Sequence, residues 1–201
     1  MNGTVLFERR FPEGLFRVYD GDPQDSQLVV AKQTHSVFVL PADTVDLANQ
    51  EADGVYGSWA QLKDRLIAVK TADCLPVLLL GKNGAAVVHA GWRGLAHGIL
   101  QADELQELAV ERAFIGPCIH ECCFEVTEEF AAHFPYSTLI KRGTKHYFDL
   151  VAEARGQLLR TFPALKVEDS GECTYCQSRY SSFRRDKTTR RIWNCFIPLA
   201  E

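Results

Sequence analysis

The stretch TADCLPVLLLGKNGAAVVHAGWRG, residues 71–94, carries the clearest structural signal in the chain. It contains two apolar runs, Leu75–Leu80 and Ala85–His89, separated by the glycine-containing segment Gly81–Gly84. Short apolar runs bounded by turn residues are typical of buried β-strands that pair as a hairpin. The stretch therefore predicts a β-hairpin with polar residues at its open end.

This hairpin can form in two registers. A four-residue loop pairs Leu80 with Ala85 and places Cys74 diagonal to His89. Diagonal neighbours in an antiparallel pair lie roughly 7–8 Å apart. A two-residue turn at Asn83-Gly84 shifts the pairing by two positions and moves Cys74 further from His89. In both registers the two side chains lie on the same face of the hairpin.

Other segments indicate an α+β fold. Further strand-like runs occur at Leu28–Ala31, Ser36–Leu40, Leu66–Val69, Ala113–Ile115 and Ile192–Ile197. Helical periodicity follows Gly98 as far as Leu108, and it resumes after the candidate caps Thr127 and Asp149. No repeat and no Ser- or Pro-rich linker divides the chain, so we expect a single domain over residues 1–201.

Composition excludes several classes of function. The chain of 201 residues has 26 acidic and 22 basic side chains and a net charge of −4, so it has no overall basic field for nucleic acid or anionic lipid. The first ten residues lack the apolar run of an export signal, and no apolar run approaches the ~18 residues of a membrane helix. We expect a soluble cytoplasmic protein whose seven cysteines are reduced.

Residues suited to metal binding lie at the predicted strand ends. Cys74 and His89, on one face of the hairpin, can share a metal ion, and His35 in the segment QTHS is the obvious third ligand. Ordinary packing explains the same residues, with Cys74 as a small buried hydrophobe and the histidines as strand-end residues. Spacing alone leaves both interpretations open.

The other cysteines form no complete metal motif. Cys173 and Cys176 form a single CxxC with no second pair at zinc-ribbon spacing. Cys118, Cys122 and Cys123 are expected to be packing thiols. Cys118 also has a chance of lining a pocket, because it ends a predicted strand before a loop.

Six short motifs occur in a fixed order along the chain. They are QTHS (33–36), TADC followed by LPVLL (71–79), HAGWRG (89–94), GPC followed by CCFEV (116–126), FDL (148–150) and CT followed by FRRD (173–186). In this order, over about residues 32–191, the chain resembles the YfiH/laccase-domain family of multicopper polyphenol oxidase-like proteins. Any one motif alone would be weak, whereas six in order form a specific signature.

The resemblance implies a fold and an activity. The implied fold is a single compact domain with mixed β-sheets in a sandwich-like core flanked by helices, similar to that of a bacterial toxin deamidase. The implied activity is that of a zinc-dependent purine nucleoside phosphorylase, which cleaves adenosine, inosine and methylthioadenosine with phosphate and has an adenosine deaminase side activity. The expected partners are therefore purine nucleosides and phosphate, with a monomer and a homodimer both open.

Residue roles follow from the same resemblance. His35, Cys74 and His89 are the expected zinc ligands and, with Asp73, the expected catalytic residues. Asp73 can orient a ligand or act as a base. Substrate binding is expected from Gln33, Arg93, Arg184, Arg185 and Cys118. Arginine binds phosphate in a bidentate manner, and the glycines on both sides of Arg93 allow close approach.

Three departures from the family pattern affect the expected cleft. Ile119-His120-Glu121 stands where the family usually has Ile-Gly-Pro, which predicts a different loop shape. Only 31 residues precede Lys32, so substrate contacts from the N-terminal region are expected to differ. Thr188–Arg191 lacks the family's glycine, which predicts altered anion binding near that turn.

Three other functions remain open. A metal-free cysteine hydrolase or amidase would use Cys74 as nucleophile and His89 as base, without needing His35 as a ligand. A copper-dependent phenol oxidase is disfavoured, although copper is a possible metal. Six histidines are too few for a four-copper centre, and the only methionine, Met1, is the sole candidate for a blue-copper axial ligand. The third alternative is a cleft that holds a purine without turnover.

Overall fold

The predicted hairpin forms the two central strands of the protein. In a computed structural model, which describes residues 3–199, these strands are β7 (Leu75–Gly81) and β8 (Gly84–Ala90), and every residue in them is buried. Leu80 pairs with Ala85, so the register of the four-residue loop is confirmed. Strands whose residues are all buried must be covered on both faces of their sheet.

β7 and β8 belong to a six-stranded sheet with the strand order β13-β9-β7-β8-β5-β4. Its other strands are β13 (Lys166–Asp169), β9 (Val110–Ile115), β5 (Gly54–Ser58) and β4 (Val39–Pro41). Side chains along β7 alternate between two apolar cores, with Val77 and Leu79 in one and Leu78 and Leu80 in the other. The sheet is therefore the middle layer of the protein.

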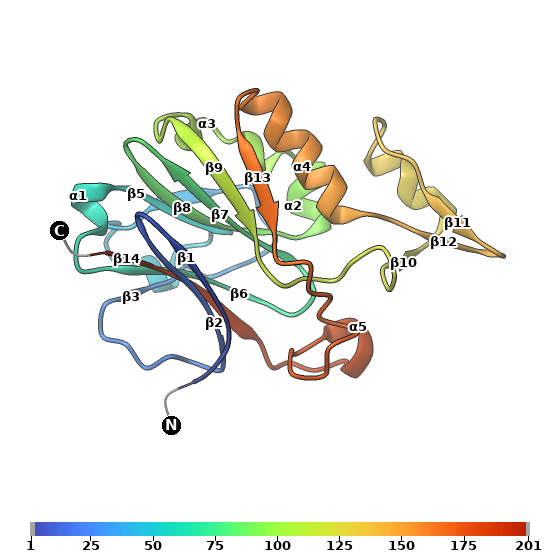
Figure 1. Cartoon of the computed structure of the whole chain (residues 1–201), viewed down its shortest axis with the longest axis horizontal. Helices are drawn as coiled ribbons and strands as arrows, with labels where there is room; N and C mark the ends of the chain where they lie inside the picture. The colour runs from blue at the N-terminus through green and yellow to red at the C-terminus, as the bar shows by residue number, and fades with distance from the viewer. Residues whose placement is uncertain (1–2, 200–201) are drawn as a thin grey trace.

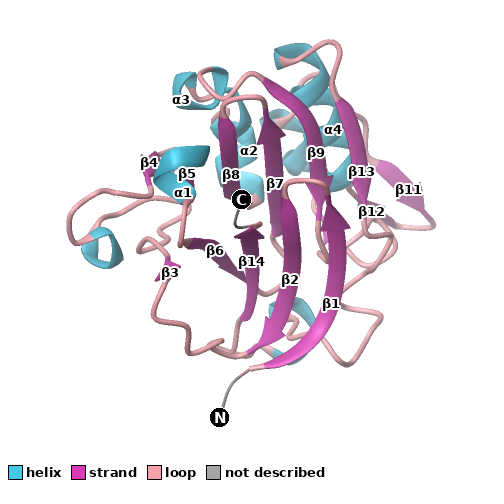
Figure 2. Cartoon of the chain, turned by 60° about the vertical axis from the view of Figure 1, so that its left-hand side comes forward, coloured by secondary structure: helices cyan, strands magenta, loops and turns pink. Residues whose placement is uncertain are grey.

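A five-stranded sheet covers one face of this middle layer. Its order is β1-β2-β14-β6-β3, with β1 (Thr4–Phe11), β2 (Gly14–Asp20), β14 (Ile192–Pro198), β6 (Leu66–Thr71) and β3 (Leu28–Val29). Figure 2 shows β1, β2 and β14 side by side in this sheet. Phe16 and Phe114 pack edge to face between the two sheets, with ring centroids 5.3 Å apart. The expected sandwich-like core of mixed sheets is confirmed.

Helices lie on the other face of the six-stranded sheet (Figure 1). The longest is α4 (Leu150–Thr161), and the side chain of Asp149 caps it by accepting a hydrogen bond from the Ala152 N–H at 2.8 Å, as its sequence position predicts. Thr127 precedes the 3-10 helix η3 (Glu128–His133) but makes no side-chain cap. One of the two predicted caps is therefore formed.

Helical residues follow Gly98 as predicted, but they form two short helices, η2 (Ile99–Gln101) and α3 (Asp103–Gln106). A third short helix, α2 (Trp92–Ala96), precedes Gly98. Gly98 has a φ of +84° and Ala102 has an extended ψ of 137°, so neither residue continues a helix. Apolar spacing was preserved across these breaks because all three helices pack on the same core.

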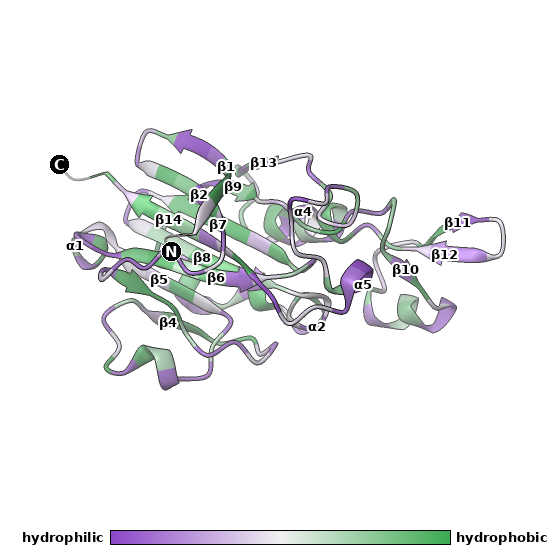
Figure 3. Ribbon diagram, turned by 90° about the horizontal axis from the view of Figure 1, so that it is seen from below, coloured by the Kyte–Doolittle hydropathy of each residue, from purple (hydrophilic) through white to green (hydrophobic). Residues whose placement is uncertain are grey.

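The remaining elements surround these layers. They are η1 (Leu47–Asn49), α1 (Trp59–Leu62), α5 (Phe183–Asp186) and a small sheet of β10 (Glu125–Val126), β12 (Lys145–Tyr147) and β11 (Ile140–Arg142). Figure 3 shows hydrophobic central strands and a hydrophilic α5. Among residues 3–199, no helix has the length and apolar character needed to span a membrane.

Candidate metal centre and substrate cleft

The register of the hairpin brings together three residues suited to metal binding. The ligand atoms of His35, Cys74 and His89 lie within 4.8 Å of one another. Cys74 immediately precedes β7, His89 lies near the end of β8, and His35 lies in the loop before β4. One thiolate and two imidazoles form a donor set typical of zinc, and three protein ligands leave a fourth position open.

A buried carboxylate fixes the orientation of His89. Asp53 is fully buried beside β5, and its Oδ1 lies 2.7 Å from Nδ1 of His89. This contact leaves Nε2 of His89 available for a metal ion, an arrangement common among metal-binding histidines. The sequence offered no signal for Asp53, because nothing in its local pattern distinguishes it from a surface acid.

The same carboxylate holds the loop that carries His35. Asp53 accepts hydrogen bonds from the N–H groups of Thr34, His35 and Ser36 at 3.1, 3.1 and 2.6 Å, and from the Ser36 hydroxyl at 2.8 Å. Burial alone would raise the pKa of Asp53, but the bonds from His89 and Ser36 lower it to about 2. A single ionised side chain therefore positions two of the three candidate ligands.

Two positions around the candidate centre have an unusual backbone conformation, and a third leaves little room for a side chain. His35 and Asp73 have φ values of +62° and +90°, which non-glycine residues rarely adopt and which are concentrated at functional sites. Gly91 is required for space, since a Cβ there would lie 3.2 Å from both Sγ of Cys74 and Cδ2 of His35. These features are consistent with a centre in which the side chains of His35 and Cys74 lie close together.

The charges of Cys74 and His89 stabilise each other. Burial opposes ionisation of the Cys74 thiol, but the adjacent His89 and His35 outweigh it and lower the pKa of Cys74 to about 6. Burial likewise opposes protonation of His89, and contacts with Cys74 and Asp53 raise the pKa of His89 to about 9. At neutral pH, the metal-free pair is therefore a thiolate and an imidazolium, and the thiolate is the form that binds metal.

Asp73 lies in the cleft but is fully engaged with the protein. Its Oδ1 accepts a hydrogen bond from the Thr174 hydroxyl at 2.7 Å, and its Oδ2 accepts one from the Arg184 N–H at 2.6 Å. The carboxylate thus joins the turn before Cys74 to the start of α5. Of the two expected roles, this arrangement suits positioning better than proton transfer.

A cleft of about 650 Å³ opens beside the candidate metal centre, a size suited to a small organic ligand. Its lining includes the three candidate ligands (His35, Cys74, His89), a basic part (Lys32, Lys70, Arg93, Arg184, Arg191), an apolar part (Ala72, Trp92, Ile119, Phe124, Phe183) and three polar residues (Gln33, Thr71, Asp73). A site with these groups can bind an anion and a planar ring side by side.

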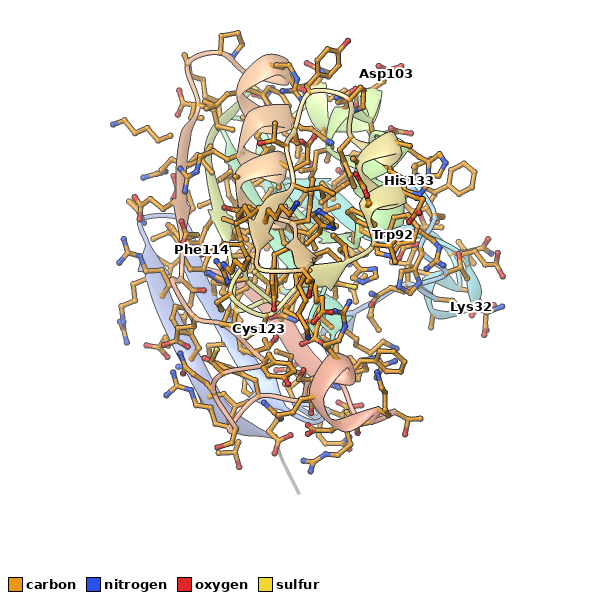
Figure 4. The ribbon with its side chains drawn as sticks, turned by 90° about the vertical axis from the view of Figure 1, so that its right-hand side faces the viewer. Lys32, Trp92, Asp103, Phe114, Cys123 and His133 are labelled. Carbon is orange, nitrogen blue, oxygen red and sulfur yellow. The ribbon has the colours of Figure 1, made fainter. Side chains whose placement is uncertain are left out.

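Aromatic rings and guanidinium groups are paired within the cleft. The guanidinium of Arg93 lies 4.5 Å from the Trp92 ring, and that of Arg184 lies 5.0 Å from the Phe124 ring. Trp92 is held in turn by His133, with ring centroids 5.0 Å apart (Figure 4). Within residues 3–199, the Arg93 guanidinium has no hydrogen-bond or ion-pair partner. Arg93 is therefore available to a ligand, and its binding of phosphate stays a prediction.

Two expected substrate-binding residues do not reach the cleft. Cys118 is fully buried and lies outside the lining. The guanidinium of Arg185 donates to the carbonyl oxygens of Thr174 and Tyr180 at 2.8 and 2.7 Å, so it holds a loop rather than an anion. His120 and Glu121 also lie outside the lining, where only the neighbouring Ile119 contributes.

Gln33 lines the cleft as predicted, but both ends of its side-chain amide bond the backbone of Lys70, at 2.7 and 2.8 Å. It fastens its loop to β6. Sequence reasoning did not place Lys70, Phe124 or Phe183 in the cleft, and it considered Arg191 only within the turn near which altered anion binding was expected; all four line the cleft. Their shared position depends on contacts between distant segments, which no local pattern reveals.

Fold and site together define a class of protein, a two-sheet sandwich with a His-Cys-His centre beside a basic and aromatic cleft. The sequence model of the family described as "Multi-copper polyphenol oxidoreductase laccase" matches residues 16–197. The chain belongs to this family, and the resemblance seen in its motifs is confirmed.

Individual relatives agree with this assignment. A protein of Aquifex aeolicus named "Purine nucleoside phosphorylase" is 34% identical over 96% of this chain and 100% of its own. A protein named "Adenosine deaminase RL5", from an unknown prokaryotic organism, is 35% identical over 79% of this chain and 70% of its own. A crystal structure of a Neisseria meningitidis protein superposes with a TM-score of 0.75 at 30% identity, covering 86% of this chain and 75% of that one.

Proposed function

We propose that the chain is a zinc-dependent purine nucleoside phosphorylase that cleaves adenosine, inosine and methylthioadenosine, with adenosine deamination as a side activity. The observation that carries this proposal is the adjacency, in one cleft, of a three-ligand metal centre, guanidinium groups and aromatic rings. The names of relatives at 34% and 35% identity support the reaction class.

The purine ring and the phosphate each have a matching part of the cleft. The faces of Trp92, Phe124 and Phe183 suit a purine ring, and Phe183 is 51% exposed, so part of its ring is accessible to a ligand. Arg93 suits phosphate, because its guanidinium can form two parallel hydrogen bonds to phosphate oxygens. The cleft can thus hold both reactants at once.

His35, Cys74 and His89 would hold the metal ion, and Asp53 would keep two of these ligands in place. When bound, zinc would supply a Lewis acid with one open position for a substrate atom. Copper would compete for the same donors, so the metal is part of the proposal and is decided by elemental analysis.

The proposed reaction is a displacement at the anomeric carbon. A phosphate oxygen forms a bond to that carbon, the bond to the purine nitrogen breaks with its electron pair on the base, and the base takes up a proton. Phosphate must be aligned behind the anomeric carbon for this to outcompete water, and Arg93 supports that alignment. The products are a free base and a sugar 1-phosphate.

The reaction class is tested by identifying products. The purified protein is incubated with each of the three nucleosides, with and without phosphate, and products are separated by chromatography. Phosphate-dependent release of base with ribose 1-phosphate, or methylthioribose 1-phosphate, supports the proposal. Free ribose would make the protein a hydrolase, and inosine formed from adenosine with the sugar still attached would make deamination its main reaction.

One observation favours a second candidate, a metal-free cysteine hydrolase or amidase. Cys74, His89 and Asp53 form a thiolate, imidazole and carboxylate series like that of cysteine enzymes. His35 separates the two functions. His35→Ala abolishes activity if a metal ion is needed, whereas a cysteine enzyme keeps its activity after the same substitution and after treatment with a chelator.

A further inference from the structure

Four cysteines outside the proposed active centre converge from two distant segments. Cys122 and Cys123 lie between β9 and β10, and Cys173 and Cys176 follow β13. Their sulfur atoms all lie within 4.8 Å of one another. The structure thus supplies the second pair that Cys173 and Cys176 lack at zinc-ribbon spacing, because the adjacent cysteines some fifty positions earlier fold onto them.

The sulfur separations suit a tetrahedral ion. Sγ of Cys176 lies 3.7 Å from Sγ of Cys122 and 3.3 Å from Sγ of Cys123. Zinc–sulfur bonds of about 2.3 Å in a tetrahedron place sulfur atoms about 3.8 Å apart. All seven cysteines are unpaired, with no disulfide in the described part of the chain. The cluster is therefore close to the size of a four-thiolate zinc site.

The backbone of the Cys173–Cys176 turn is arranged to support a thiolate. Burial tends to raise the pKa of Cys173, but N–H groups of His120, Cys176 and Tyr175 directed at its sulfur lower it overall. Backbone donors are thus directed at one of the four sulfur atoms that the fold brings together.

This cluster joins a loop that lines the cleft, through Ile119 and Phe124, to a second loop that supports it. Reciprocal backbone hydrogen bonds link them, from Cys118 N–H to the Glu172 carbonyl at 3.2 Å and from Thr174 N–H to the Cys118 carbonyl at 2.9 Å. Thr174, within the CxxC turn, donates to Asp73, and Phe124, next to Cys123, lines the cleft. Figure 4 labels Cys123 in the first of these loops.

We propose that Cys122, Cys123, Cys173 and Cys176 bind a structural zinc ion that fastens the 118–126 loop to the 172–177 loop. Four protein ligands close the coordination sphere, which is typical of a structural ion. The site shares no ligand with the His35, Cys74 and His89 centre. Its occupancy can therefore be measured separately from that of the proposed active centre.

Metal stoichiometry tests the site separately from the active centre. The full chain is purified with a reductant, and zinc per chain is measured for the wild type, Cys74→Ala, Cys173→Ser/Cys176→Ser and a matched control, Cys195→Ser, which removes a buried thiol in β14. We expect about two zinc ions in the wild type and the control, and about one in each of the other two variants. One zinc in the wild type that disappears in Cys74→Ala overturns the structural site while leaving the active centre intact.

A second measurement does not depend on the folding of the double variant. Cobalt is added to the Cys74→Ala protein, and its absorption spectrum is recorded. We expect a thiolate-to-cobalt charge-transfer band and the ligand-field bands of a tetrahedral cobalt ion bound by four sulfur atoms. Absence of these bands overturns the proposal. Free thiols are also counted in the wild type after denaturation without a reductant. A count of five rather than the seven cysteines of the sequence would overturn the proposal, because it would mean that two cysteines of the cluster form a disulfide.

Discussion

Asp53 Oδ1 lies 2.7 Å from Nδ1 of His89, and the same carboxylate accepts the backbone N–H of His35. One buried charge thus orients two candidate ligands that come from separate segments of the chain. Carboxylate partners of this kind set the tautomer and direction of metal-binding histidines. The centre is therefore defined by four residues rather than three.

Asp53→Asn tests this relationship. The amide keeps the size of the side chain but removes its charge, so zinc should bind about 10–100-fold more weakly. Chelator competition measures the dissociation constant, and circular dichroism checks the fold. Glu51→Gln is the matched control, because Glu51 is an exposed acid paired with Lys32. Equal zinc affinity in Asp53→Asn and the wild type would show that Asp53 does not support the centre.

Gly91→Ala tests whether the space beside the ligands matters. The new Cβ would lie 3.2 Å from Sγ of Cys74, so the side chains of Cys74 and His35 must shift by a few tenths of an ångström, and zinc affinity should fall about tenfold. Gly156→Ala is the control, since its Cβ would meet only the flexible end of Arg160 on α4. The same chelator competition is used, and a Gly91→Ala protein that binds zinc normally would contradict the packing described.

Zinc affinity should fall as pH falls. In the metal-free protein, the pKa of His89 is about 9 and that of Cys74 about 6, so at pH 7 one proton on His89 must leave when metal binds. Below about pH 6, Cys74 takes up a second proton. The apparent affinity should therefore drop about tenfold per pH unit from pH 8 to 6 and more steeply below. Zinc titrations at several pH values measure this slope, and a flat profile would rule out this ligand pair.

Arg93→Ala should raise the KM for phosphate by about 10–100-fold, because it removes a pair of charge-assisted hydrogen bonds to phosphate. The zinc content should stay unchanged. Arg93→Lys should recover only part of the effect, because lysine keeps the charge without the planar fork. Arg10→Ala, at an arginine on β1 whose side chain is 81% exposed, is the control. Unchanged phosphate dependence in Arg93→Ala would remove this residue from the anion site.

Local patterns predicted the parts of the structure that depend on neighbouring residues. The apolar runs and the glycine-containing loop between them identified the β7–β8 hairpin, and of the two registers left open the one with the four-residue loop is formed. The register placed Cys74 and His89 on one face of the hairpin. It did not distinguish a metal site from ordinary packing of these residues, and only the resemblance of the motifs to the YfiH/laccase-domain family favoured a metal site. The Asp149 cap was also visible, because capping is a local interaction.

Features that depend on distant contacts were missed. β1 carries Glu8, Arg9 and Arg10 in its C-terminal half, and this charged, exposed pattern hides a strand that pairs with β2. Asp53 differs from a surface acid only through its partners across the fold. The Cys122–Cys123 pair and the CxxC at Cys173 meet only because two loops pack together.

The most direct test of the proposed function follows phosphate itself. Inosine and inorganic phosphate are incubated with zinc-loaded protein, with chelator-treated protein and with the treated protein after zinc is restored, and phosphorus NMR records the products. The account predicts that a sugar 1-phosphate signal grows at the expense of inorganic phosphate with the loaded and restored protein and is absent with the treated one. Equal rates of base release in all three samples, or base release without consumption of phosphate, would contradict it.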